Sequence, residues 1–196
     1  MNTKVAELEN RILILARELE HCRSRCILLE REVEFLRLHP TISQGLKGER
    51  LVCQLTGGIL TKYADKYDVA LPNLATVEVK HSKLNIPVHG SSTRRWNWSK
   101  PLGHLDKGKE YDFLILLGEK DERYPEQYVD DSPFVCFLVP RDIVPSLITK
   151  GRTVGGMIQL SSNLSTGWSE KSAIIRRHMI SLSDIESLLN SAKPLE

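Results

Sequence analysis

The stretch DVALPNLATVEVK, residues 68–80, decides the fold of this chain. Two short runs rich in apolar and β-branched residues flank a Pro-Asn pair, which is typical of a turn between strands. Because side chains alternate between the two faces of a strand, we expect Glu78 and Lys80 on one face and Val77 and Val79 on the other, toward the core. The sequence therefore predicts two consecutive strands joined by a short turn.

The same stretch holds two carboxylates and an ammonium at a spacing suited to phosphodiester chemistry. Asp68 opens the first run and Glu78 lies in the second, and Mg²⁺ is usually held by one or two carboxylates together with water and phosphate oxygens. Such a cation neutralises developing charge and acidifies its bound water, while Lys80 would orient that water and stabilise charge at phosphorus. The alternative interpretation is an exposed Glu-Lys pair on an edge strand. The accompanying Asp68 and the apolar valines favour the metal site.

At these positions the chain resembles the PD-(D/E)XK nuclease superfamily, the restriction-endonuclease-like group. The resemblance is carried by Asp68 and Glu78-Val79-Lys80, together with Glu49 on an upstream helix. The family aspartate often follows proline, whereas Tyr67 precedes it here. The resemblance covers roughly residues 42–140 and is specific at three or four positions.

The resemblance implies an α/β fold class, with a restriction-endonuclease-like core whose mixed central β-sheet is flanked by helices. It also implies Mg²⁺-dependent cleavage of nucleic acid, with Mn²⁺ able to substitute. Asp68, Glu78 and the Val79 carbonyl would hold the metal, Glu49 would support them, and Lys80 would serve the attacking water.

The composition indicates how the chain is organised. Its 196 residues suit one catalytic domain plus an appendage, and we place a dimerisation helix at 1–38 and the nuclease domain at 42–196. The net charge is only +2, so affinity for nucleic acid has to come from local patches. Four cysteines without CxxC spacing, no long apolar run and no secretory leader predict a cytoplasmic protein without a membrane partner.

The first 38 residues carry a heptad repeat whose ten consecutive seam positions are all apolar or cysteine. Three β-branched residues at a positions and four leucines at d positions favour a parallel two-stranded coiled coil. The predicted dimerisation seam consists of Val5, Leu8, Ile12, Leu15, Leu19, Cys22, Cys26, Leu29, Val33 and Leu36.

The charges beside this seam support the pairing of two parallel copies. Of the five g–e pairs between partners, four are attractive and none repels, which selects orientation and register although each exposed pair adds little energy. The alternative is an amphipathic helix that packs on its own domain. A second apolar stripe at b and c positions leaves two arrangements open, packing on a catalytic domain or association of two dimers. This stripe consists of Leu13, Ile14, Ile27, Leu28 and Phe35.

A polar stretch after the second strand is the best candidate for contact with DNA. It mixes arginines, which contact phosphates or guanine edges, with tryptophans, which stack on bases. The alternative is that the two tryptophans share one face of a strand and anchor it on the core, with the arginines solvated. A second basic patch near the C-terminus is equally open to a solvated role. The predicted DNA-binding residues are His81, Ser82, Lys83, Arg94, Arg95, Trp96, Trp98, Lys100, Arg176 and Arg177.

The remaining apolar runs predict further elements. Asp112, at the start of the first of the two buried strands expected here, is interpreted as a structural hydrogen-bonding group, and the acidic segment 119–133 is expected to face away from DNA. The expected elements are a helix at 41–54, buried strands at 111–118 and 134–140, a short helix at 141–148, a late strand at 153–160 and a terminal helix at 181–189.

Together these features predict a Mg²⁺-dependent endonuclease that cuts both strands of double-stranded DNA as a homodimer or a dimer of dimers. A sequence-specific restriction role of type II is the first hypothesis. Holliday-junction resolution and repair are alternatives within the same superfamily. A non-catalytic coiled-coil assembly or DNA-binding protein is the rival from another class.

Overall fold

The computed structural model describes residues 2–62, 65–87, 93–104, 108–149, 156–165 and 169–191, with only the backbone of 2–6 and 40–41. The chain divides into two compact units, Met1–Ser43 and Gln44–Glu196. None of the helices in the described ranges combines the length and the apolar character that crossing a membrane requires.

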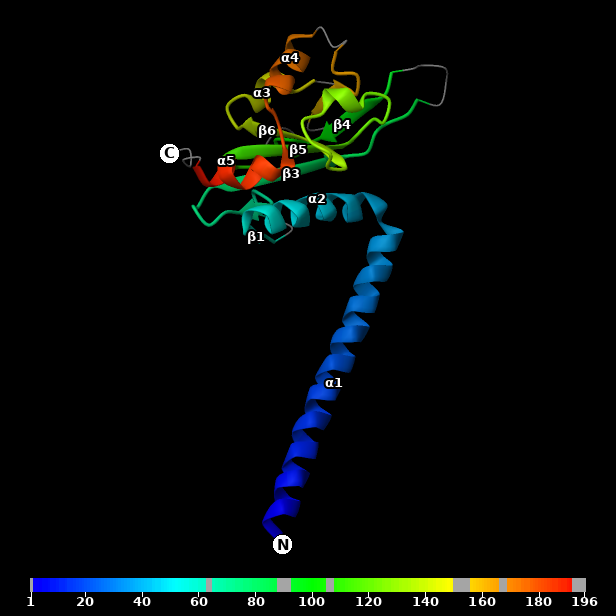
Figure 1. Ribbon diagram of the computed structural model, residues 1–196, viewed down its shortest axis with the longest axis vertical. Coiled ribbons are helices and arrows are strands. Elements are labelled where there is room, and N and C mark those ends of the chain that lie inside the picture. Colours follow the sequence, from blue (N-terminus) through cyan, green and yellow to red (C-terminus); the bar gives the residue numbers. More distant parts are fainter. Residues whose placement is uncertain are drawn as a thin grey trace. The chain divides into compact units, whose positions relative to one another are not determined.

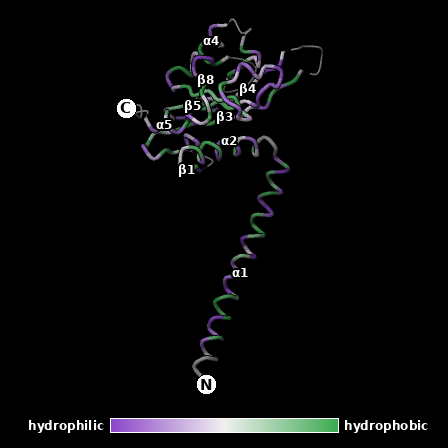
Figure 2. Tube along the Cα trace, viewed as in Figure 1, coloured by the Kyte–Doolittle hydropathy of each residue, from purple (hydrophilic) through white to green (hydrophobic). Residues whose placement is uncertain are grey.

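The first unit is dominated by one continuous helix, α1 (Asn2–Leu38), which ends just before His39-Pro40, as the sequence predicts (Figure 1). Apolar and polar segments alternate along it (Figure 2). The described seam side chains are exposed in the single chain, except for Leu36, which is half-buried, and among the aliphatic ones the exposed fraction runs from 47% at Val33 to 66% at Ile12. The side chain of the first seam residue, Val5, lies outside the described residues.

The second unit is built around a mixed sheet in the order β1-β2-β3-β5-β6-β8. β3 and β5 run parallel, whereas the other described neighbours run antiparallel, so a mixed central sheet is confirmed. The predicted pair of strands around the Pro-Asn turn is also confirmed, as β2 and β3. The strands are β1 (Ile59–Leu60), β2 (Val69–Ala70), β3 (Thr76–Ser82), β5 (Phe113–Glu119), β6 (Phe134–Pro140) and β8 (Met179–Ile180).

Helices α2 (Pro40–Thr56) and α5 (Ile185–Ser191) cover one face of this sheet (Figure 1). The core on this side joins Val52 of α2 and Leu189 of α5 to Val77 and Val79, which point inward as predicted. α2 begins one residue before the predicted helix and ends at Thr56, two residues after the predicted end. The next residue, Gly57, takes a φ of +65°, a conformation in which glycine is favoured.

The other face is covered by a small second sheet and by helices α3 (Val144–Leu147) and α4 (Glu170–Arg177) (Figure 1). The second sheet pairs β4 (Arg95–Ser99) with β7 (Met157–Ser161), antiparallel. This core contains Trp96, Trp98 and Phe137. Because β5 contributes apolar side chains to both faces, it is a fully buried central strand.

The other sequence predictions of secondary structure are largely confirmed. β5 and β6 lie on the predicted strands 111–118 and 134–140, and α3 lies in the predicted helix 141–148. The predicted terminal helix is a short 3₁₀ turn, Leu182–Asp184, followed by α5. Residues 153–155 of the predicted late strand lie outside the described residues. α4, β1 and β8 had no counterpart in the prediction.

Candidate functional site

The predicted aspartate is fixed where β2 meets β3. The backbone amide of Asp68 donates to the carbonyl oxygen of Val77 at 3.0 Å, which holds this residue beside the neighbouring strand. Its carboxylate oxygen Oδ2 accepts a hydrogen bond from the amide of Val79 at 2.9 Å. The side chain of Asp68 is therefore oriented along β3, toward the predicted glutamate and lysine.

Glu78 and Lys80 lie on the same face of β3, as predicted, and form an ion pair. The ammonium nitrogen of Lys80 also lies 4.0 Å from Oδ2 of Asp68. Glu78 is completely buried, and β3 lies between β2 and β5 and not at an edge of the sheet. The alternative of an exposed pair on an edge strand is therefore wrong.

A second lysine, which sequence reasoning missed, joins these residues. The ammonium nitrogen of Lys109 lies 3.1 Å from Oδ1 of Asp68 and 2.8 Å from Oε2 of Glu78, so one cation bridges both carboxylates. Backbone pairing brings it there, since the amide of Glu110 donates to the carbonyl oxygen of Lys66 at 3.0 Å. The available signal was its place just before a buried strand, but the parallel pairing of that strand with β3 is not visible in the sequence.

Glu49 reaches the same neighbourhood from α2. Gly48 lets this helix lie close to the sheet, because a Cβ there would lie 3.3 Å from Leu117 Cδ1 and 3.4 Å from a methyl carbon of Val79. Burial raises the pKa of Glu49, and the negative charge of Asp68 raises it further, whereas Lys80 opposes the shift. We call Glu49, Asp68, Glu78, Lys80 and Lys109 the acid–lysine cluster.

The electrostatics of the cluster follow from burying opposite charges together. Burial raises the pKa of Glu78, the charge of Lys80 opposes this, and the charge of Asp68 adds to it. Burial alone would lower the pKa of Lys109, but its close ion pair with Glu78 and the charge of Asp68 raise it above the ordinary value. Lys109 is therefore held as an ammonium.

The carboxylate pair of the cluster fits a divalent cation. Oδ1 of Asp68 and Oε2 of Glu78 already converge on a single positive group, and Oε2 is buried and accepts no hydrogen bond of good geometry from the described residues. Across those residues, no three histidine, cysteine, aspartate or glutamate side chains are grouped closely enough to hold a metal. One or two carboxylates with water are, however, the usual protein ligands of Mg²⁺. Val79 contributes its amide to Asp68, and its carbonyl as a ligand stays a prediction.

The structure corrects three of the predicted DNA contacts. Trp96 and Trp98 are 0% and 1% exposed, and their indole nitrogens donate to the carbonyl oxygens of Glu119 and Leu117. Stacking of these tryptophans on bases is therefore wrong, and the alternative that they anchor a strand on the core holds. Ser82 is also buried, and its hydroxyl accepts from the amide of the neighbouring strand β4, so it is not available to a phosphate.

The other predicted DNA contacts divide into engaged and exposed side chains. His81 lies on the opposite face of β3 from Glu78 and packs edge-on against Phe134, so it is not brought to the cluster. Arg176 donates to backbone carbonyls, and Arg94 pairs with Asp121 at 3.1 Å. Nucleic-acid contacts by these arginines stay predictions. The exposed candidates are Lys83, Arg95, Lys100 and Arg177.

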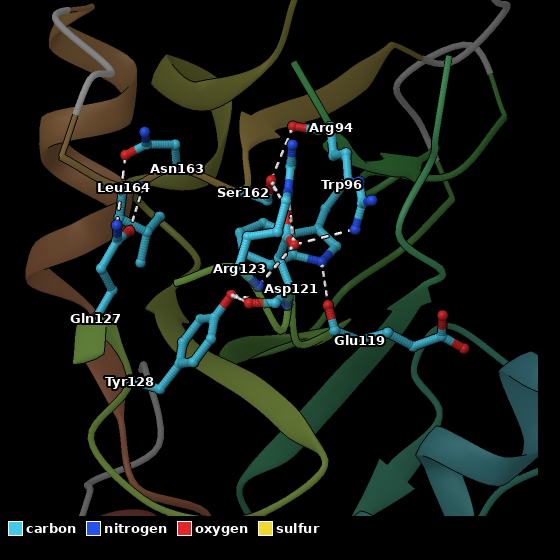
Figure 3. Close-up of polar contacts among 10 residues, drawn as sticks. All are labelled: Arg94, Trp96, Glu119, Asp121, Arg123, Gln127, Tyr128, Ser162, Asn163 and Leu164. Atoms are coloured by element: carbon cyan, nitrogen blue, oxygen red, sulfur yellow. Dashed lines mark hydrogen bonds and ion pairs between the residues drawn. The ribbon is translucent and has the colours of Figure 1, made fainter. Parts of the chain in front are cut away.

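A buried carboxylate explains how the second sheet is held to the first (Figure 3). Asp121 is fully buried and accepts from Arg123 at 2.7 Å, Ser162 at 2.7 Å and Arg94 at 3.1 Å. Burial would raise the pKa of Asp121, but the hydrogen bonds from Arg123 and Ser162 lower it to about 2. The acidic segment 119–133 thus contributes a structural ion-pair network. The predicted structural role of Asp112 is confirmed, since its carboxylate accepts from the amide of Thr76 at 2.7 Å.

The structure therefore brings together Asp68, Glu78 and Lys80 as predicted, places Glu49 within their electrostatic range, and adds Lys109. The predicted DNA-contact side chains that are still available all lie outside this cluster. The chain matches no protein-family model, and no curated protein matches its sequence. Its function therefore has to be inferred from the geometry of the cluster itself.

Proposed function

We propose that this protein is a divalent-metal-dependent nuclease that hydrolyses phosphodiester bonds of double-stranded DNA. The observation that carries the proposal is the convergence of Asp68 and Glu78 on one cation position, with Lys80 beside them. A fully buried Glu78 beside a half-buried Asp68 is costly to keep for stability alone, and acids with perturbed surroundings of this kind are candidates for functional sites.

Each residue of the cluster has a role in this proposal. Asp68 and Glu78 hold Mg²⁺ or Mn²⁺, which supplies charge neutralisation at the phosphate and a more acidic water. Lys80 orients the attacking water and stabilises the negative charge that develops on the phosphoryl oxygens. Glu49 would support the metal ligands from α2, since it lies within electrostatic range of Asp68 and Glu78.

The specific role that we propose is two-strand cleavage by a homodimer held through α1. The exposed seam of that helix and its attractive g–e charges support a parallel pair of copies. A symmetric pair of sites suits a palindromic or nearly palindromic target, as in restriction of foreign DNA. Junction resolution and repair use the same chemistry and differ in the DNA structure that is cut.

The proposal is tested by plasmid digestion with Mg²⁺, with and without EDTA. We expect cleavage that EDTA abolishes, and a loss of at least about a hundred-fold in rate for Glu78→Gln and for Lys80→Met, because each removes a charge from the reacting centre. Glu110→Gln and Lys66→Met are matched controls, since these side chains form an exposed ion pair outside the cluster. Full activity of Glu78→Gln, or activity in EDTA, would contradict the proposal.

A second candidate is a non-catalytic assembly or DNA-binding protein. It is favoured by the fact that Lys80 and Lys109 neutralise the two acids within the chain, as a structural ion-pair network would. In that case supercoiled plasmid stays intact in Mg²⁺ and Mn²⁺, while Glu78→Gln lowers the unfolding temperature. Any DNA binding would still weaken with salt, because phosphate contacts release counterions.

A further inference from the structure

Lys109 is the member of the acid–lysine cluster whose position the nuclease proposal leaves unexplained. Its ammonium nitrogen lies 3.1 Å from Oδ1 of Asp68 and 2.8 Å from Oε2 of Glu78. The side chain is only 20% exposed, so solvent screens these contacts little. A divalent cation bound to the same two oxygens would lie close to this ammonium, and the two positive charges would repel each other.

We propose that Lys109 is an internal counterion that holds the cation position between Asp68 and Glu78 until a divalent metal displaces it, and that it then pairs with the substrate phosphate. This inference rests on the proposed function, because it names how metal and nucleic acid are coupled at the same site. Lys80 does not serve in this way, since it pairs with the other carboxylate oxygen of Glu78, Oε1.

The charge balance of the cluster supports the displacement. The two carboxylates of Asp68 and Glu78 contact the two ammoniums of Lys80 and Lys109, so these pairs balance in charge without metal. A divalent cation added to them leaves excess positive charge, and a phosphodiester is a group that offsets it. Metal binding therefore frees an ammonium at the point where the substrate needs one, and each ligand raises the affinity of the other.

The test is a calorimetric titration of Mn²⁺ into wild-type protein and Lys109→Met in the absence of DNA. We expect the variant to bind Mn²⁺ at least about five-fold more tightly, because no ammonium competes for the two oxygens. Lys66→Met removes an exposed ammonium paired with Glu110 and is expected to leave the affinity unchanged. Equal or weaker Mn²⁺ binding by Lys109→Met overturns the inference.

A second measurement follows binding of a short DNA duplex by fluorescence anisotropy, in EDTA and in Ca²⁺. Lys109→Met is expected to lose affinity for DNA in Ca²⁺ but not in EDTA, since wild-type Lys109 is free to reach phosphate only when a metal has displaced it. The same loss in both conditions would mean that Lys109 never pairs with the acids in solution. If Lys109→Met is unfolded in EDTA, Lys109→Gln, which keeps a hydrogen-bond donor, takes its place.

Failure of this inference and failure of the proposed function are distinguishable. If wild type cuts plasmid in Mg²⁺ but Lys109→Met binds Mn²⁺ with unchanged affinity, only the counterion role is wrong. If wild type does not cut but Lys109→Met binds Mn²⁺ more tightly, the nuclease proposal is wrong and the counterion role stands. If neither protein binds Mn²⁺, both are wrong.

Discussion

At the scale of single residues, Glu78 is the side chain that packing alone does not explain. It is completely buried on a central strand, where its neighbours on the chain are apolar. Removing a carboxylate from water costs several kcal/mol, and two ammoniums offset this only when their geometry is good. A chain optimised for stability would carry an apolar residue here, and this cost supports the proposed role of Glu78 at the site.

A single methyl group added at Gly118 should strain the packing of Trp96 against β5. A Cβ there would lie 2.7 Å from Nε1 and 2.8 Å from Cδ1 of Trp96. The indole cannot retreat, because it is fully buried and donates to the carbonyl oxygen of Glu119 at 2.7 Å. We expect Gly118→Ala to lower the free energy of unfolding by about 1–3 kcal/mol, measured by urea denaturation followed by tryptophan fluorescence.

The matched control is the same substitution at a helical glycine with room around it. At Gly45, in α2, the nearest atom to an added Cβ is Oε1 of Glu49 at 3.7 Å, an ordinary contact. Alanine there should stabilise the helix by about 0.5–1 kcal/mol. If Gly118→Ala proved as stable as wild type, the close packing of Trp96 against β5 would be contradicted.

At the scale of elements, strand β4 shows where the sequence misleads. Trp96 and Trp98 share one face and Arg95 lies on the other, which is the alternation of a half-buried strand. The mixture of arginine and tryptophan is typical of a nucleic-acid-binding surface. Composition does not reveal, however, which backbone carbonyls lie near enough to accept from the indoles. The acceptors for both indoles are supplied by β5 and become known only once the two layers are packed.

The same limit separates the predicted from the missed members of the cluster. Asp68 lies directly before β2 and Glu78 lies on β3, the two strands of one hairpin, so their approach is local and can be predicted from spacing. Lys109 reaches them through the parallel pairing of β3 with β5, whose residues are far apart in the chain. Such pairing is fixed by burial of both faces of β5, a property of the whole sheet.

The Asp121 network gives a prediction at the scale of elements, because it joins the second sheet to the segment after β5 (Figure 3). The pKa of Asp121 is lowered to about 2 by hydrogen bonds from Arg123 and Ser162, which outweigh the effect of burial. A carboxyl whose pKa is lower in the folded state stabilises the fold when ionised. We expect Asp121→Asn to cost about 2 kcal/mol of unfolding free energy at neutral pH.

The sign of the pH dependence makes this prediction specific. The contribution of Asp121 is complete above the ordinary pKa of an unfolded aspartate and disappears as pH falls toward about 2. Urea denaturation at neutral pH and in steps below about pH 4 should therefore show the stabilities of wild type and Asp121→Asn converging. Glu122→Gln, at an exposed neighbouring position, is the control. A gap that is independent of pH would show that the ion pairs of Asp121 do not stabilise the fold.

At the scale of the whole molecule, the helix expected from the heptad repeat is present as α1 (Asn2–Leu38), and the chain divides into two compact units after Ser43. A dimerisation role for the first unit and a nuclease role for the second stay predictions. The heptad pattern is local and repeats, so it is visible without tertiary information. Pairing of α1 with a second copy involves another chain, so dimerisation through this helix stays a prediction.

Dimerisation through α1 is tested by a charge at the centre of its seam. Leu15 is 56% exposed in the single chain, and in a parallel pair the Leu15 side chains of both copies would become buried. Leu15→Lys removes both apolar contacts and places two like charges together, so we expect the dissociation constant to rise at least about a hundred-fold. Analytical ultracentrifugation measures this, and Ser24→Lys, which adds the same charge at an f position outside the seam, should leave the dimer intact.

The same variant connects assembly to cleavage. Two sites in a symmetric dimer cut both strands in one encounter, whereas a monomer has one site and cuts one strand at a time. If the proposed function holds, Leu15→Lys should therefore convert supercoiled plasmid mainly to the nicked form in Mg²⁺, while wild type and Ser24→Lys should both give linear DNA. Because Leu15 lies on α1 and the acid–lysine cluster is built from the second unit, the chemistry of a single site should persist. If Leu15→Lys is fully monomeric and still gives linear DNA, two-strand cleavage does not require pairing through this helix.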